Sequence, residues 1–156
     1  MPSCHLVLRQ LLARIEDEAT GAIKLKTCQV DIPESRQKQL QLAAKNLGQD
    51  FIAAYPWQKQ TKPKSDSIEQ LLENRSWQAA LSITGISGLP ELKDAGNVTR
   101  PELSVKLSLR IPPTAKPEQV AAELKQTLET SPPFNADVKF SVQDIGSGWN
   151  SPDMSS

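Results

Sequence analysis

Two polar residues in the second half of the chain have the types and positions to bind a substrate. Asn97 follows Gly96 in a turn between two expected strands, and Arg110 lies near the end of the second strand. An arginine guanidinium can hold a carboxylate through two parallel hydrogen bonds, and an asparagine amide can donate to a carboxylate or an oxyanion. The pattern alone favours a structural interpretation, with Asn97 as a left-handed turn residue and Arg110 as a solvated cation on a sheet face.

The other polar residues show no pattern of a catalytic or metal centre. A catalytic zinc site requires about three protein ligands, whereas the chain has one histidine, His5, and two cysteines, Cys4 and Cys28, without metal or redox spacing. The acidic run at residues 16–18 is expected to be a solvated helix end, and no nucleophile or phosphate-loop motif is present. The sequence therefore predicts no catalytic residue and no metal ligand here, and it places His5 at the surface.

Composition argues against several classes of partner. The chain has 156 residues, about the size of one domain, and its 18 basic and 18 acidic residues cancel. A zero net charge argues against nucleic acid, and no apolar run approaches the roughly 18 residues that span a bilayer. A signal-peptide pattern is missing at the N-terminus, and two unpaired thiols fit a reducing compartment. We therefore expect a cytoplasmic protein with no nucleic-acid or membrane partner.

The first half of the chain has helical periodicity. A first helix is expected to begin after Ser3 and to end at Gly21. Its apolar face consists of Leu8, Leu11, Leu12 and Ile15. Residues 22–30 read as a short extended segment, a second helix is expected over residues 33–48, and a proline-containing loop leads to a third, short helix.

The second half alternates with the period of strands. Residues 79–84 and 103–111 each alternate apolar and polar side chains, the latter strictly, which predicts half-buried strands with one wet face. A helix is expected from Pro117 onward. Its apolar face consists of Val120, Ala121, Leu124 and Leu128. A last strand is expected over residues 138–142.

The order of these elements predicts an α+β fold. One more strand before the first helix would complete β-α-β-β-α-β, the ferredoxin-like arrangement. We therefore expect a ferredoxin-like antiparallel sheet with helices on one face, its first strand missing, and a helical insert at about residues 31–76. Without that strand, residues 138–142 are expected to pair directly with residues 103–111 in a three-stranded sheet. This domain would cover residues 1–145, and residues 146–156 would form a loose tail leading towards a catalytic domain.

Several short motifs resemble a known family. Residues 85–90 (GISGLP), 95–101 (AGNVTRP) and 106–113 (KLSLRIPP) resemble the lid domain of the zinc metallopeptidase family of carboxypeptidase G, carnosinase, aminoacylase and succinyl-diaminopimelate desuccinylase, peptidase family M-twenty. Residues 2–21 resemble the first helix of that lid, and Gly148-Trp149 resembles the return towards the catalytic domain. Three departures stand out. The turn around Asn97 is one residue longer, the His-Ser-Gly run of the lid's first strand is missing, and so are the metal-binding and catalytic carboxylate motifs.

The resemblance implies a function for the chain within a larger enzyme. The chain would be the lid, or dimerisation, segment of a zinc-dependent amidohydrolase, with Asn97 and Arg110 binding the substrate's carboxylate or stabilising its tetrahedral intermediate. Two zinc ions would belong to the catalytic domain of the parent enzyme and none to this chain, which would be inactive alone. Its partners would be that catalytic domain, a second copy of the chain, and a small peptide or acylated amino acid. A stand-alone ferredoxin-like binding or scaffold module with no catalytic role is the alternative.

Overall fold

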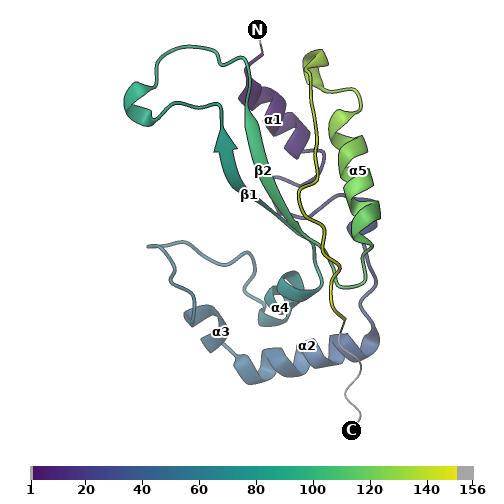
Figure 1. Cartoon of the computed structure of the whole chain (residues 1–156). Coiled ribbons are helices and arrows are strands. Elements are labelled where there is room, and N and C mark those ends of the chain that lie inside the picture. The colour runs from purple at the N-terminus through teal and green to yellow at the C-terminus, as the bar shows by residue number, and fades with distance from the viewer. Residues whose placement is uncertain (1, 151–156) are drawn as a thin grey trace.

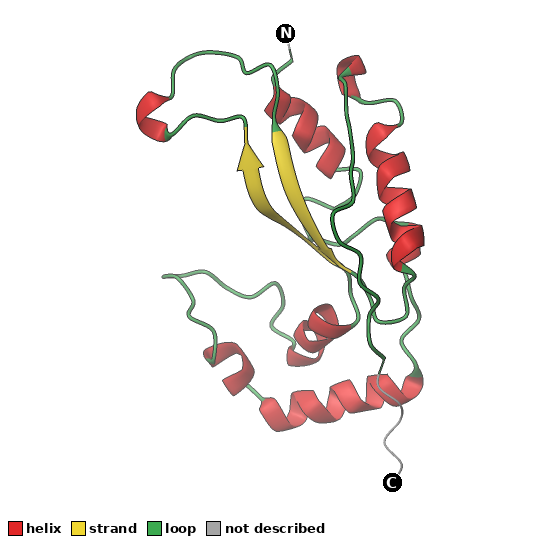
Figure 2. Cartoon of the chain, in the orientation of Figure 1, coloured by secondary structure: helices red, strands yellow, loops and turns green. Residues whose placement is uncertain are grey.

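An antiparallel pair of strands lies at the centre of the chain. The computed structural model describes residues 2–150 and pairs β1 (Ala80–Ser87) with β2 (Ser104–Arg110) (Figure 1). The helices and 3-10 turns are α1 (Cys4–Leu12), η1 (Lys26–Cys28), α2 (Glu34–Leu47), α3 (Asp50–Ala53), α4 (Ile68–Ser76), η2 (Leu92–Asp94), α5 (Pro117–Glu129) and η3 (Pro133–Asn135). Helices α1 and α5 flank the strand pair, and α2, α3 and α4 lie beyond one of its ends (Figure 2). The predicted α+β class is confirmed.

The alternation of apolar and polar residues decides which face of the sheet is buried. Along β2 every second side chain is half-buried and those between are exposed, as expected of a strand with one wet face. The register places Leu81 opposite Leu109 and Ala80 opposite Arg110, so the apolar residues of both strands share one face. A bulge between Ile83 and Gly85 shifts the register further along.

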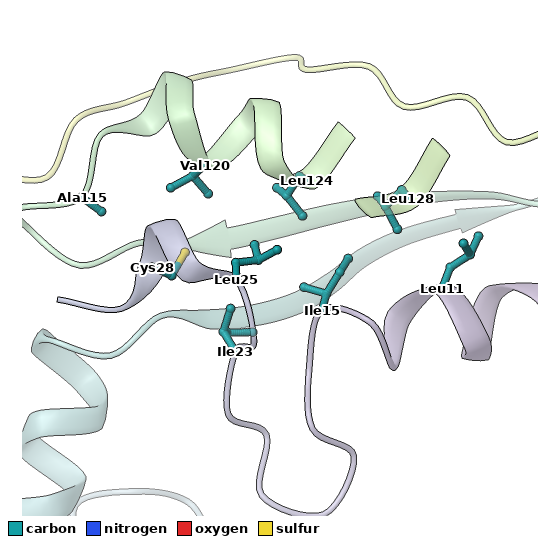
Figure 3. Packing of buried hydrophobic residues seen from close by; sticks show 9 residues of the cluster. All are labelled: Leu11, Ile15, Ile23, Leu25, Cys28, Ala115, Val120, Leu124 and Leu128. Atoms are coloured by element: carbon teal, nitrogen blue, oxygen red, sulfur yellow. The ribbon is translucent and has the colours of Figure 1, made fainter. Parts of the chain in front are cut away.

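The core lies between that apolar face and the helices. Leu81 and Leu109 pack against a cluster that α1, α5 and the extended segment before η1 complete. Ile15 is 0% exposed and Leu25 is 2% exposed at the middle of this cluster (Figure 3). The other buried members are Leu11, Ile23, Cys28, Ala115, Val120, Leu124 and Leu128. The predicted apolar face of α5 therefore points into the core, as the helical period required.

The first helix is shorter than its sequence pattern predicted. It ends at Leu12 and not at Gly21, and the chain then turns so that Ile15 enters the core from outside the helix. A tight hairpin follows, in which the Asp17 N–H donates to the Ala22 carbonyl at 2.8 Å. Gly21, at φ +70°, takes the left-handed conformation in this turn, which glycine adopts without strain. The residues whose spacing predicted one long helix therefore lie on a shorter helix and on the turn that follows it.

The acidic run at residues 16–18 lies in this hairpin, which corrects its interpretation as a helix end. The Thr20 hydroxyl donates to Asp17 Oδ1 at 2.7 Å, and the Thr20 N–H donates to the same oxygen at 2.8 Å. These two hydrogen bonds lower the pKa of Asp17. Asp17 therefore stabilises a local turn, as aspartate commonly does.

The predicted helical insert is present and contains three helices. Helix α2 packs against α4, and the short α3 leads into the loop before α4. Ser67 caps α4, its hydroxyl accepting from the Gln70 N–H at 3.3 Å. Among the described residues no helix is both long enough and apolar enough to cross a membrane.

The predicted three-stranded sheet is wrong. Residues 138–142 are not a strand, and the sheet contains β1 and β2 alone among the described residues. Val138 and Phe140 nevertheless pack against the core cluster, while Val142 is 47% exposed. The Phe140 N–H donates to Glu129 Oε1 at 2.8 Å, so a side chain of α5 takes a hydrogen bond that a neighbouring strand would have taken. Apolar side chains of this segment therefore pack against the core, although its backbone does not pair with a strand. Of the expected tail, residues 151–156 lie outside the described residues.

The side chains of Arg14 and Glu123 connect α5 by hydrogen bonds to the segments around it. Arg14 Nη1 donates to the carbonyls of Thr127 and Thr130 at 3.1 and 2.9 Å, at the end of α5 where helix carbonyls lack partners. The Glu123 carboxylate accepts from the N–H groups of Lys26 and Thr27, each at 2.9 Å. The Thr27 hydroxyl also donates to it, at 2.6 Å. Burial raises the pKa of Glu123, but the hydrogen bonds from Thr27 and Lys26 outweigh it, so this pKa lies below its ordinary value of 4.5.

Replacing Glu123 should therefore destabilise the fold in a pH-dependent way. We expect Glu123→Gln to lower the free energy of unfolding by about 1 kcal/mol at pH 7, because charge-assisted hydrogen bonds are stronger than neutral ones. Since the folded-state pKa is the lower one, this stability is present above the ordinary pKa of 4.5 and is lost as the pH falls below it. Urea unfolding at pH 7 and pH 3 should show that the difference in the free energy of unfolding between the native chain and the Glu123→Gln variant is smaller at pH 3. The exposed Glu102→Gln is the control, and an equal difference at both pH values would contradict this role for Glu123.

Candidate functional site

Arg110 ends β2 on the wet face of the sheet. Its side chain is exposed, and its Nη2 donates to the backbone carbonyl of Asn74 at 2.8 Å. Asn74 lies in the last turn of α4, where carbonyl groups have no partner within the helix and carry partial negative charge. Arg110 is thus more than a solvated cation, because it connects the sheet to the insert. Sequence reasoning missed this contact, since a backbone carbonyl leaves no signal in residue types.

Asn97 lies in the long loop that joins β1 to β2. Its side chain is exposed, and in the described part of the chain no hydrogen bond to that side chain forms. The left-handed alternative for Asn97 is wrong, because the non-glycine residues with positive φ are Lys59, Ser131, Phe134 and Asn135. The amide of Asn97 is therefore available to a partner outside the chain.

The structure does not bring Asn97 and Arg110 together. The register pairs Ala80 with Arg110 at one end of the sheet and Ser87 with Ser104 at the other, and the loop with Asn97 extends from the second end (Figure 1). Seven residues of β2 span about 20 Å at about 3.4 Å per residue. A dipeptide-sized substrate is shorter than that distance. The two side chains of one chain therefore cannot bind the same small substrate in this arrangement.

The remaining candidates do not form a reactive centre. His5 is exposed in the first turn of α1, as the sequence predicted. Both cysteines are free thiols: the Cys4 Sγ donates to the Arg100 carbonyl at 3.2 Å, and burial raises the pKa of Cys28 to about 11. A thiol with such a pKa stays protonated and unreactive. Across residues 2–150 there is no group of three or more His, Cys, Asp or Glu side chains that could hold a metal ion. The described side chains therefore offer no site for the zinc ions, which the resemblance assigns to a catalytic domain.

A pocket beside Arg110 was not predicted from the sequence. It has a volume of about 890 Å³ and lies between the insert and the end of the sheet where Arg110 is found. Lys64 and Arg75 also line it, and both come from the insert. The sequence offered only a lysine-containing loop and a helix at these positions, because their approach to Arg110 depends on how the insert folds back.

Comparison with known proteins identifies the domain. The family model described as the peptidase dimerisation domain matches residues 6–135, which covers most of α1 and all of the insert, the strand pair and α5. No curated protein sequence matches the chain.

Solved peptidase structures share this fold at low sequence identity. Human carnosine dipeptidase 1 superposes with a TM-score of 0.63 at 20% identity, over 83% of this chain and 27% of the dipeptidase. The Saccharomyces cerevisiae dipeptidase Dug1p gives 0.63 at 21% identity, over 81% of this chain and 26% of that protein. A metallo-carboxypeptidase of the M20 family from Sulfolobus solfataricus gives 0.59 at 14% identity, over 83% of this chain and 29% of the carboxypeptidase.

The chain thus spans less than a third of the length of each of these structures. What they share with it is the fold, and the family match extends over most of the chain, insert included. The chain belongs to the peptidase dimerisation domain family.

Proposed function

We propose that this chain is the lid, dimerisation and substrate-clamping segment of a zinc-dependent peptidase or amidohydrolase. Its substrates would be small peptides or acylated amino acids. Membership of the dimerisation domain family supports this, as do structural neighbours that are named as two dipeptidases and a metallo-carboxypeptidase. The catalytic zinc ions would belong to a separate catalytic domain, because the described side chains of this chain do not form a metal site.

The observation that carries the proposal is the position of Arg110. It stands at the end of a rigid strand, on the face that the helices leave open, and one guanidinium nitrogen is held by Asn74. That contact anchors one end of the guanidinium, while its other N–H groups have no partner among the described residues. A guanidinium oriented in this way can form two parallel hydrogen bonds with a substrate carboxylate.

The sheet also offers a surface for a second copy of the chain. Strand β1 pairs with β2 along one edge only, and its other edge is open in the described structure. Ile83 and Ile86 on this strand are 51% and 50% exposed. An open edge with exposed apolar side chains favours pairing with another strand. We therefore propose a homodimer, and the two free thiols support a cytoplasmic location.

The stand-alone binding or scaffold module is the less supported alternative. The ferredoxin-like arrangement by itself hosts many functions, so the fold cannot exclude such a module. The family match, however, is to a domain named for its role in peptidases and extends over most of the chain.

Removing the guanidinium should impair catalysis and leave the fold intact. In the enzyme that joins this chain to its catalytic domain, we expect Arg110→Ala to lower kcat/KM by about 2–4 kcal/mol, or about 30-fold to about 900-fold, as for a lost charge-assisted contact at a transition state. Steady-state kinetics and thermal unfolding measure the two effects. Lys106→Ala, another cation on the same face of β2, should change neither. Unchanged kcat/KM, or a loss of folding, would rule out the clamp.

The distance between Asn97 and Arg110 leads to a second prediction. If both side chains act on one small substrate, they come from different protomers of the dimer. We expect Asn97→Ala and Arg110→Ala enzymes to be separately impaired. After subunits are mixed and exchanged, a heterodimer has one site with both native residues, so activity should recover to about half of the native level in that species. Activity that stays at the level of the separate mutants after verified exchange would place both residues in one protomer's site or remove Asn97 from it.

The metal prediction can be tested on the chain alone. We expect the purified chain to retain well under one zinc ion per molecule after dialysis, because tight zinc sites need about three or four protein ligands. Elemental analysis measures the content. Stoichiometric zinc that survives a mild chelator would show that the metal is held by this segment and not by the catalytic domain alone.

A further inference from the structure

The pocket between the insert and the sheet has the features of a separate binding site. Its volume of about 890 Å³ is in the range of small-molecule sites. It is lined by the hairpin around Gly21, the start of β1, the segment from Phe51 to Trp57 and α4. Concave surfaces of this kind, between two parts of a fold, are where proteins usually hold small ligands.

The charge of the pocket wall has one sign. Lys64, Arg75 and Arg110 line it, and none of its described lining residues is an aspartate or a glutamate. The chain as a whole has zero formal net charge, so this excess of cations is local. Cations gathered on the wall of one cleft favour an anionic ligand.

The Lys64 ammonium is placed at the wall and is available. It lies over Gly21, at the position where the Cβ of any other residue would be. In the described structure it forms neither a hydrogen bond nor an ion pair, so its donors can turn to a ligand. The left-handed turn favours glycine at position 21, whereas the flexible end of Lys64 could move away from a larger residue there.

Aromatic rings supply the apolar part of the wall. Phe51 and Tyr55 meet edge to face with centroids 5.9 Å apart, and Tyr55 lies 5.9 Å from Trp57. The Trp57 indole donates to the Ile52 carbonyl at 2.8 Å, and Arg75 Nη1 donates to the Tyr55 hydroxyl at 2.9 Å. These bonds orient rings that remain partly uncovered, with Tyr55 42% and Trp57 39% exposed. Oriented, uncovered rings favour a planar or aromatic ligand.

We propose that this pocket binds a small aromatic carboxylate. The carboxylate lies between Lys64 and Arg75, and the ring of the ligand lies against Tyr55 and Trp57. The cations that define the site come from the insert, so the site does not depend on the peptidase function proposed above. Arg110 lines the same pocket, but one of its donors is already held by Asn74.

The probe for this site is 2-naphthoate, and its cationic counterpart 2-naphthylmethylamine is the matched control. Each is titrated into the full chain while the indole N–H resonance of Trp57 is followed by NMR. The signal is assigned with Trp57→Leu. We expect a saturable shift with naphthoate and none with the amine. Equal responses to both probes would overturn the proposal, because the pocket would then select rings and not charge.

Variants of the two insert cations locate the carboxylate. We expect Lys64→Gln and Arg75→Gln each to weaken naphthoate binding by about tenfold, as for a lost hydrogen bond to a charged group. Lys62→Gln, an exposed lysine of the same loop outside the pocket wall, should leave the dissociation constant unchanged. Arg75→Lys should retain most of the binding, which separates charge from any loosening of Tyr55. Binding that depends on Arg110 alone, and not on Lys64 or Arg75, would overturn the site while leaving the proposed clamp standing.

Discussion

The structure depends on burying one apolar face of a sheet that has only two strands. A two-stranded ribbon is at best marginally stable in water, so other segments must complete its core. Helices α1 and α5 cover the face, and the turn and extended segment that carry Ile15 and Leu25 fill the space between them. Glu123 and Arg14 then satisfy backbone groups at the joints between these segments. The core is therefore made from several short, irregular pieces held around one regular surface.

The same constraint decides where polar side chains can act. Because the helices occupy one face of the ribbon, exposed side chains of β2 all project from the other face, and Arg110 is the last of them. The ribbon also acts as a spacer that keeps its two ends apart. Arg110 belongs to the end beside the insert, and Asn97 to the loop beyond the other end. A domain built in this way keeps these two polar side chains at opposite ends of one ribbon.

The insert lies beyond one end of the ribbon and is distinct from the apolar core. None of the residues of α2, α3 and α4 is buried. The hydrogen bond from Arg110 to Asn74 connects the insert to the sheet, and that from Arg75 to Tyr55 connects two segments within the insert. Because these contacts leave aromatic rings and cations facing a cavity, the insert forms a surface that differs in character from the apolar core. The positive charge in this cavity arises from the way the chain folds back, since the composition of the chain is neutral.

The sequence alone determined the regular elements, because their periods are local properties. Alternation along 103–111 placed β2 and its wet face, and the spacing of Val120, Leu124 and Leu128 placed α5 and its buried face. The short motifs around Asn97 and Arg110 also indicated the family. Tertiary structure decided where α1 ends and whether residues 138–142 pair with β2. An apolar period indicates only that a residue is buried, and not which segment packs beside it. Tertiary structure also decided the separation of Asn97 from Arg110, the hydrogen bond from Arg110 to Asn74, and the position of Lys64 and Arg75 on the wall of one pocket. Each of these depends on how separate segments are placed relative to one another.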